Sequence, residues 1–192
     1  MIKTVADMVN GRLEEIQETE IYYIYENHSV EVAAKYLVEH RMRAVGVFDH
    51  QERLCGVLSH SDIVDQVVAP DKIPRVTKVA EIMTKNMLLV TASASIIECR
   101  RLMRTFNLYH LIAVRDSVKE MFIEGKKDSN CSFYGLDETI PKHAINKSII
   151  TRDHFLGLIS EKDLRKAELE KALEEIARLN EERQHLLNFI SS

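Results

Sequence analysis

The chain has 192 residues, of which 45% are hydrophobic, enough to bury a core in one domain or in two small ones. Lysine and arginine total 26 against 30 aspartate and glutamate residues, so the formal net charge is −4. This balance argues against nucleic-acid binding, which needs a strongly basic face. No apolar run approaches the roughly 18 residues that cross a bilayer. The N-terminus lacks the charged-then-apolar pattern of a secretion signal, and we therefore expect a cytoplasmic protein without a membrane segment.

The chain is predicted to contain two copies of one unit, each folded as strand, helix, strand, strand, helix. In the first copy the strands are IYYIY at 21–25, AVGVF at 44–48 and RLCGVLS at 53–59. Ser29 is a good N-cap for the first helix. The apolar residues of that helix recur at helical spacing, at Val30, Ala33, Ala34, Leu37 and Val38.

The second copy follows the same order. Its strands are MLLV at 87–90, LIAV at 111–114 and HFLGLIS at 154–160, and Ser95 is the N-cap of its first helix. Val30 and Ile96 are equivalent positions, 66 residues apart. The distance from Val30 to the glycine of the third strand is 26 residues, whereas from Ile96 it is 61. The second copy therefore carries an insertion of 35 residues.

A corner of matching composition ends the third strand of each copy. GVLSHSD at 56–62 and GLISEKD at 157–163 both read glycine, two aliphatic residues, serine, two variable residues and aspartate. Each serine can cap the following helix, and each aspartate falls in the first turn, where the helix dipole favours it. A capping box is one interpretation. The other is a binding site, because a carboxylate beside free backbone N–H groups can accept hydrogen bonds from sugar hydroxyls while those N–H groups face an anion.

These two corners, together with VADMV at 5–9 and VAEIM at 79–83, resemble a tandem pair of CBS domains, a Bateman module. The resemblance covers roughly residues 3–116 and 154–168. It implies an α/β fold of two β-α-β-β-α repeats packed about a pseudo-twofold axis, with repeat 1 at 1–70 and repeat 2 at 71–168. It also implies two clefts that in the family commonly bind AMP, ADP, ATP or S-adenosylmethionine. No further cofactor is implied.

The resemblance implies a set of ligand-binding residues. Ser59, Ser61 and Asp62 would lie in one cleft, and Ser160, Lys162 and Asp163 in the other. Arg43, Ala44, Tyr109 and His110 precede the second strands, where the family places groups near the base and phosphate. Tyr23 and Leu89, on the first strands, would line the adenine pocket or belong to the core. The family often has proline where this chain has Gly46 and Ile112, so the backbone beside the base is expected to depart from the family's route.

The insertion, residues 117–153, mixes β-rich pieces with turn residues and is predicted to form an extended hairpin or flap. Its charged residues are either solvated surface or part of a lid or partner-docking arm near the second cleft. In the latter case the phosphate site would gain Lys126, Lys127, Lys142, His143 and Lys147.

From Glu161 the sequence reads as one long helix, with a coiled coil over 169–192. A heptad seam is formed by Leu169, Ala172, Ile176, Leu179, Arg183, Leu186 and Ile190. A helix reaching about 45 Å cannot bury this seam alone. We expect it to pair with a second copy as a parallel or antiparallel homodimer and to reach an output domain or partner protein. The alternative is a helix folded back on its own domain.

Three cysteines, Cys55, Cys99 and Cys131, occur without a CxxC pair and predict reduced thiols. Cys55 and Cys99 are interpreted as core residues and Cys131 as exposed. The eight histidines show no metal-binding spacing. The sequence also lacks a phosphate-cradling glycine loop and a nucleophile with a paired base, so no enzyme activity is predicted. The leading hypothesis is a regulatory, signal-transducing sensor of adenine nucleotides, and the alternative is a ligand-free dimerisation scaffold.

Overall fold

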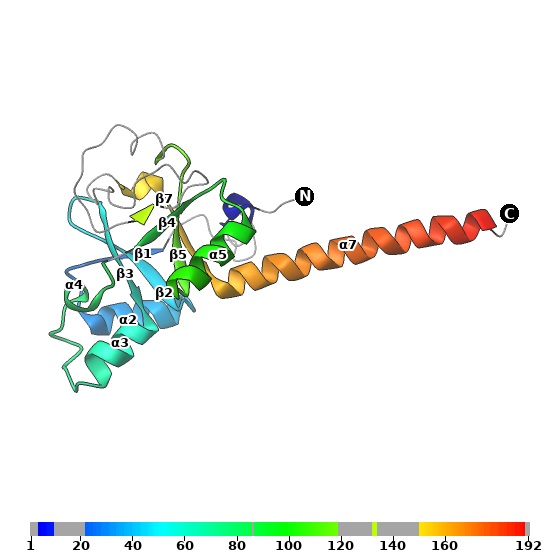
Figure 1. Cartoon of the computed structure of the whole chain (residues 1–192). Helices are drawn as coiled ribbons and strands as arrows, with labels where there is room; N and C mark the ends of the chain where they lie inside the picture. The colour runs from blue at the N-terminus through cyan, green and yellow to red at the C-terminus, as the bar shows by residue number, and fades with distance from the viewer. Residues whose placement is uncertain (1–3, 10–21, 86, 119–131, 134–149, 191–192) are drawn as a thin grey trace.

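The computed structural model describes residues 4–9, 22–85, 87–118, 132–133 and 150–190. Two β-sheets with helices on their outer sides form the body, and a single long helix leaves it (Figure 1). The predicted architecture of two α/β repeats is confirmed.

The first repeat consists of β1 (Tyr23–Tyr25), α2 (Val30–Glu39), β2 (Ala44–Phe48), β3 (Leu54–Ser59) and α3 (His60–Ile63). β1 and β2 are parallel, with α2 as their crossover, and β3 returns antiparallel to β2. The predicted cap of α2 is present, because the Ser29 side chain accepts a hydrogen bond from Val32 N. A π-helical turn, Val64–Val68, follows α3 directly.

The second repeat consists of α4 (Val79–Ile82), β4 (Leu88–Thr91), α5 (Ile96–Phe106), β5 (His110–Val114), β6 (Ser132–Phe133), a 3₁₀ turn (Arg152–His154), β7 (Phe155–Ser160) and α7 (Glu161–Ile190). The pairings of the first repeat recur, with β4 parallel to β5 and β7 antiparallel to β5. Ser95 caps α5 as predicted, by accepting from Glu98 N.

The insertion contributes one short strand to this sheet. β6 lies parallel to β4 along its outer edge, which gives the strand order β6-β4-β5-β7. The five basic residues proposed for a lid lie outside the described residues. The prediction of a hairpin or flap over 117–153 therefore stays a prediction.

The short segment that precedes each repeat packs on the other repeat. Val5 N donates to Ala94 O at 2.9 Å, and Val79 N donates to His28 O at 3.0 Å. The apolar side chains follow the backbone. Val5, Met8 and Val9 complete the core of the second repeat, and Val79, Ile82 and Met83 complete that of the first. The predicted domain boundary at 70/71 separates the two repeats along the sequence. Each core, however, contains residues from both sides of that boundary.

A third core lies between the two sheets. Its centre is a T-shaped contact between Phe48 and Phe155, with ring centroids 5.4 Å apart. A Cβ placed on Gly46 would stand 2.7 Å from Cζ of Phe155, so the absence of a side chain at Gly46 makes room for this ring. The other buried members are Ala44, Leu54, Met87, Leu89, Ile112, Val114, Val118, Ile150 and Leu158. This shared core joins the repeats face to face.

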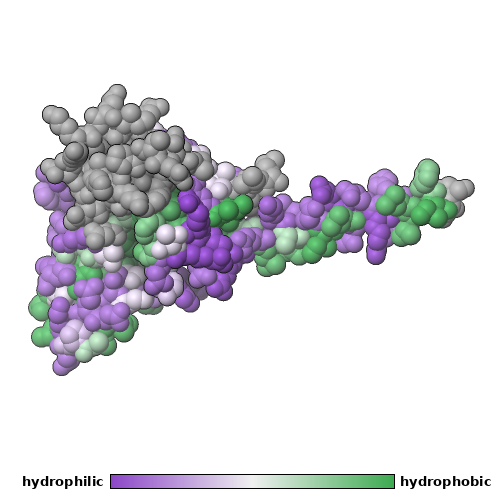
Figure 2. All heavy atoms as spheres, viewed as in Figure 1, coloured by the Kyte–Doolittle hydropathy of each residue, from purple (hydrophilic) through white to green (hydrophobic). Residues whose placement is uncertain are grey.

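α7 leaves the body after its first two turns. Leu164 and Ala167 are buried in the core of the second repeat, and Arg100 of α5 pairs with Glu168 at 2.5 Å. Every residue from 171 to 190 is exposed, and apolar side chains run along the helix (Figure 2). The alternative in which the helix folds back on its own domain is therefore wrong. In the described part of the chain, no helix has the length and apolar character needed to cross a membrane.

Two cysteines can be placed. Cys99 is buried and Cys55 is half-buried, and both are reduced thiols, as predicted. Burial raises the pKa of the Cys99 thiol to about 12, and the neighbouring Glu98 carboxylate adds to the effect. Cys131 lies outside the described residues.

Candidate functional site

The first predicted corner is a capping box. Ser59 N and Ser59 Oγ donate to Asp62 Oδ2 at 2.8 and 2.6 Å, and Asp62 N donates back to Ser59 Oγ at 3.3 Å. The other carboxylate oxygen, Oδ1, accepts from Thr84 Oγ1 at 3.3 Å. The capping interpretation drawn from the sequence is confirmed here, and the bonds that make the cap use Oδ2.

The second corner repeats this geometry. Ser160 N and Ser160 Oγ donate to Asp163 Oδ2 at 2.7 and 2.6 Å, and Asp163 N donates to Ser160 Oγ at 3.3 Å. The glycines of the two corners serve different needs. Gly157 has φ +124°, whereas a Cβ at Gly56 would stand 2.6 Å from Sδ of Met83. The two corners therefore have the same hydrogen bonds, but glycine is needed for its backbone angle in one and for lack of space in the other.

Strand register brings the predicted neighbours to these corners. Ala44 of β2 lies opposite Ser59, and His110 of β5 lies opposite Ser160. His60 N donates to Arg43 O at 3.0 Å, which ties the start of β2 to the first turn of α3. Arg43, Tyr109, Ser61 and Lys162 are all exposed around the two corners. Ten of the predicted residues therefore fall into two groups at equivalent places in the repeats.

Tyr23 and Leu89 lie elsewhere. Leu89 is fully buried in the core between the sheets. The Tyr23 ring packs edge-on against Phe48, and its hydroxyl accepts from Arg152 Nη1 at 2.5 Å. Both residues pack as part of the inter-sheet core, which is the alternative that the sequence left open.

A polar cluster joining the repeats was not predicted. Tyr25 Oη donates to Glu52 Oε1 at 2.5 Å, and Arg152 Nη1 pairs with Glu52 Oε2 at 3.3 Å while its guanidinium lies 4.8 Å above the centre of the Tyr23 ring. The hydrogen bond with Glu52 is the main reason that the pKa of Tyr25 is raised to about 12. Arg152 belongs to the insertion, where no periodic pattern marked it.

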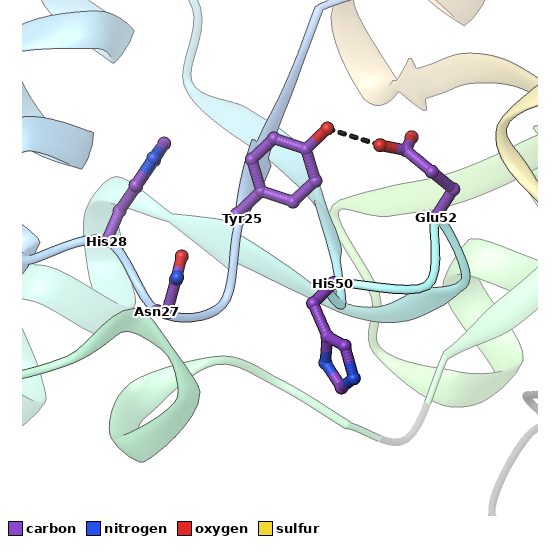
Figure 3. A pocket seen from close by; sticks show the side chains of 5 residues that line it. All are labelled: Tyr25, Asn27, His28, His50 and Glu52. Atoms are coloured by element: carbon purple, nitrogen blue, oxygen red, sulfur yellow. Dashed lines mark hydrogen bonds between the residues drawn. The ribbon is translucent and has the colours of Figure 1, made fainter.

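A hollow of about 350 Å³ lies beside this cluster, lined by Tyr25, Asn27, His28, His50 and Glu52 (Figure 3). A second, of about 310 Å³, is lined by Ala6, Val9, Ala92, Arg115, Asp116 and Leu156. Both hollows adjoin the carboxyl ends of the parallel strands, whereas the two corners adjoin the amino ends of β2 and β5. Neither hollow contains a predicted ligand residue.

The first hollow does not gather metal ligands. His28 and His50 point in different directions (Figure 3). Within the described ranges, no three His, Cys, Asp or Glu side chains are placed to hold a metal ion.

Curated relatives match parts of the chain. A 17.7 kDa protein of Acidianus ambivalens is 27% identical over 108 residues, covering 56% of this chain and 64% of the relative. The CBS domain-containing protein CBSCBSPB1 of Arabidopsis thaliana is 30% identical over 84 residues, covering 44% and 16%. Protein MJ1404 of Methanocaldococcus jannaschii is 28% identical over 118 residues, covering 55% and 27%. The chain thus spans less than two thirds of each of these relatives.

Solved structures share the fold over most of the chain. A protein with CBS domains from Burkholderia ambifaria MC40-6 has a TM-score of 0.63 at 23% identity, covering 88% of this chain and 95% of its own. The CBS domain pair of protein MJ0100, solved with 5′-methylthioadenosine and S-adenosyl-L-methionine, has a TM-score of 0.59 at 16% identity, covering 89% and 99%.

The sequence profile of the CBS domain matches the chain twice, at residues 13–69 and 79–119. Together these matches span half of the chain, and they fall on the two repeats. The chain belongs to the CBS-domain family, as a tandem pair of the regulatory-module type.

Proposed function

We propose that this chain is the sensing part of a regulatory protein, in which the two corners bind adenine nucleotides of the AMP, ADP and ATP class, or S-adenosylmethionine. α7 relays the bound state. The observation that carries the proposal is the duplicated Ser-x-x-Asp corner, built with the same hydrogen bonds at the end of β3 and of β7. The ligand of the MJ0100 pair supports the adenosine class.

The chemistry of the corner is compatible with ribose binding and capping together. An ionised carboxylate offers about four acceptor positions; at Asp62 the capping bonds take two of them at Oδ2, and Thr84 Oγ1 takes a third at Oδ1. A ribose hydroxyl would donate to Asp62 or Asp163 alongside the capping bonds, taking the place of Thr84 Oγ1 at Asp62. Phosphate oxygens would then meet the exposed side chains of Arg43 at the first corner and Lys162 at the second, with His110 beside the latter.

The relay is proposed for the second corner. α3 has only four residues before the π-helical turn, whereas the helix that Asp163 caps continues unbroken to Ile190. Leu164 and Ala167 fix the first turns of this helix in the core, and Glu168 is tied to Arg100. A ligand that binds two orientations of α7 with different affinity would shift the balance between them.

The alternative is a ligand-free dimerisation scaffold, and one observation favours it. The two hollows described above lie away from the corners. In a scaffold, the Ser-x-x-Asp corners would serve only to start two helices.

Thermal unfolding with AMP, ADP, ATP, S-adenosylmethionine and GTP separates the two functions. A ligand at 100 times its Kd adds about 2.7 kcal/mol to the free energy of unfolding, which shifts the melting temperature measurably. We expect a shift with an adenine ligand that Asp62→Ala, Asp163→Ala or both abolish. Protein freed of carried-over ligand that shows no shift with any adenine compound supports the scaffold.

The chain offers a matched control for these substitutions. Thr4 N and Thr4 Oγ1 donate to Asp7 Oδ2 at 2.8 and 3.0 Å, so Asp7 makes the same kind of cap away from both corners. Asp7→Ala should lower the melting temperature and leave the ligand-induced shift intact. If Asp7→Ala abolished the shift as well, the loss would reflect general destabilisation and the two corners would lose their assignment.

A further inference from the structure

The exposed part of α7 carries four rows of residues spaced seven apart. Rows a and d form the predicted seam, row g lies beside d, and row e lies beside a. Row a contains Leu169, Ile176, Arg183 and Ile190, and row d contains Ala172, Leu179 and Leu186. Row g contains Glu168, Glu175, Glu182 and Phe189, and row e contains Leu173, Asn180 and Leu187. One flank of the seam is thus acidic as far as Glu182, and the other carries no charge.

The seam itself is uncovered in the single chain. Leu169, Ile176 and Leu186 are 61%, 55% and 64% exposed, on a helix that stands clear of the body (Figure 1). β-branched isoleucine in row a with leucine in row d favours pairing of two parallel helices. The apolar identities along this seam therefore fit one further copy of the same helix.

The acidic row distinguishes the two orientations of such a pair. In an antiparallel pair row g faces the partner's row g, so Glu175 and Glu182 of one helix would lie near the same residues of the other. In a parallel pair row g faces row e, where Leu173, Asn180 and Leu187 carry no charge. Arg178 contacts both Glu175 at 2.6 Å and Glu182 at 3.9 Å, so a single arginine serves two glutamates and that part of the row stays acidic. Like charges in register are destabilising, and this disfavours the antiparallel pair.

Arg183 adds a second argument. It is the single charged residue in rows a and d, and a lone polar residue in row a specifies register and partner number. In a parallel, in-register pair each Arg183 lies next to Glu182 of the other helix, which supplies the opposite charge. In the parallel, in-register orientation, the seam and flanks of one helix therefore complement those of the second copy.

We propose that α7 pairs with a second copy as a parallel, in-register coiled coil, which places both CBS pairs at the same end. This inference rests on the helix pairing in the proposed function and fixes its orientation. A rotation of α7 at the corner of one subunit would then act directly on α7 of the other subunit.

Cysteine cross-linking of the full chain tests the orientation. Ala172→Cys and Leu186→Cys each place a thiol in row d, on either side of Leu179. In a parallel pair each variant alone forms a disulfide dimer on mild oxidation. A mixture of the two, unfolded and refolded together, joins 172 to 172 and 186 to 186 but not 172 to 186. A dimer in which neither variant cross-links alone would overturn the parallel arrangement, because row d faces the partner's row a in an antiparallel pair.

The controls separate this inference from the function on which it rests. Lys171→Cys lies on the outer face and should not cross-link, and the wild-type chain gives the background from its own cysteines. Light scattering on the uncross-linked protein measures the mass in solution. A monomer would refute the helix pairing and the orientation together. A dimer that neither variant cross-links alone refutes the orientation alone.

Discussion

Phe155 of the second repeat occupies the space that a side chain on Gly46 of the first repeat would need. Its Cζ lies 2.7 Å from the position of a Cβ at Gly46, closer than real Cβ contacts. The ring is almost fully buried against Phe48, so it cannot turn away without opening the inter-sheet core. The glycine on the first sheet therefore leaves the space that the large Phe155 side chain on the second sheet fills.

Gly46→Ala should therefore destabilise the protein, by about 1–3 kcal/mol for an overpacked core. Phe155→Leu in the Gly46→Ala background should recover part of the loss, because the smaller side chain frees the space. Urea unfolding of the two single variants and the double variant measures both terms. Gly157→Ala is the control, since no atom lies within 4 Å of its Cβ position and its cost comes from φ +124°. Equal effects of Phe155→Leu in both backgrounds would mean that the two sites are not coupled.

Without ligand, the corners should behave as helix caps. Ser59→Ala and Ser160→Ala each remove the acceptor of an aspartate N–H and a donor to its carboxylate. We expect each to lower the free energy of unfolding by about 0.5–2 kcal/mol. Ser61→Ala, on the exposed first turn of α3, should stay within about 0.5 kcal/mol of the wild type. Denaturant unfolding in nucleotide-free buffer measures all three, and a neutral Ser160→Ala would show that α7 does not depend on its cap.

Tyr25 should titrate apart from the other tyrosines. Its pKa is raised to about 12, chiefly by the hydrogen bond to Glu52, against an ordinary value near 10. Because the folded state favours the protonated phenol, its contribution to stability is complete below pH 10 and is lost as the pH rises from 10 toward 12. Tyrosinate absorbance should show a late component that Tyr25→Phe removes and that Glu52→Gln moves toward lower pH. A wild-type titration complete near pH 10 would contradict the hydrogen bond.

The two placed thiols should differ in reactivity. Cys99 is buried and its pKa is raised to about 12, so little thiolate forms at pH 8. In Cys55→Ser/Cys131→Ser protein, a thiol reagent should label Cys99 only as fast as the protein unfolds. In Cys99→Ala/Cys131→Ser protein, half-buried Cys55 should react sooner under the same conditions. Equal rates in the folded state would show that the core around Cys99 opens readily.

Local chemistry made much of this fold predictable. Ser29 and Ser95 cap their helices through the next residues along the chain, and AVGVF forms β2 with the predicted bounds. Contacts between residues far apart in the sequence have no such local pattern. No local pattern places Arg152 over Tyr23, or distinguishes Leu89 as a core residue from Leu89 as a pocket residue. The two aspartates were identified because their corner repeats, and their caps were visible in the same spacing.

The exchange of the short segments before each repeat has a consequence for synthesis on the ribosome. Residues 5–9 emerge before the surface they cover, which includes β4 and α5, about 90 residues further on. At a translation rate of about 5–20 residues per second, they wait roughly 5–20 seconds for it. The first repeat waits as well, because Val79, Ile82 and Met83 complete its core. Residues 5–9 thus lack their packing partner until the second repeat has been made.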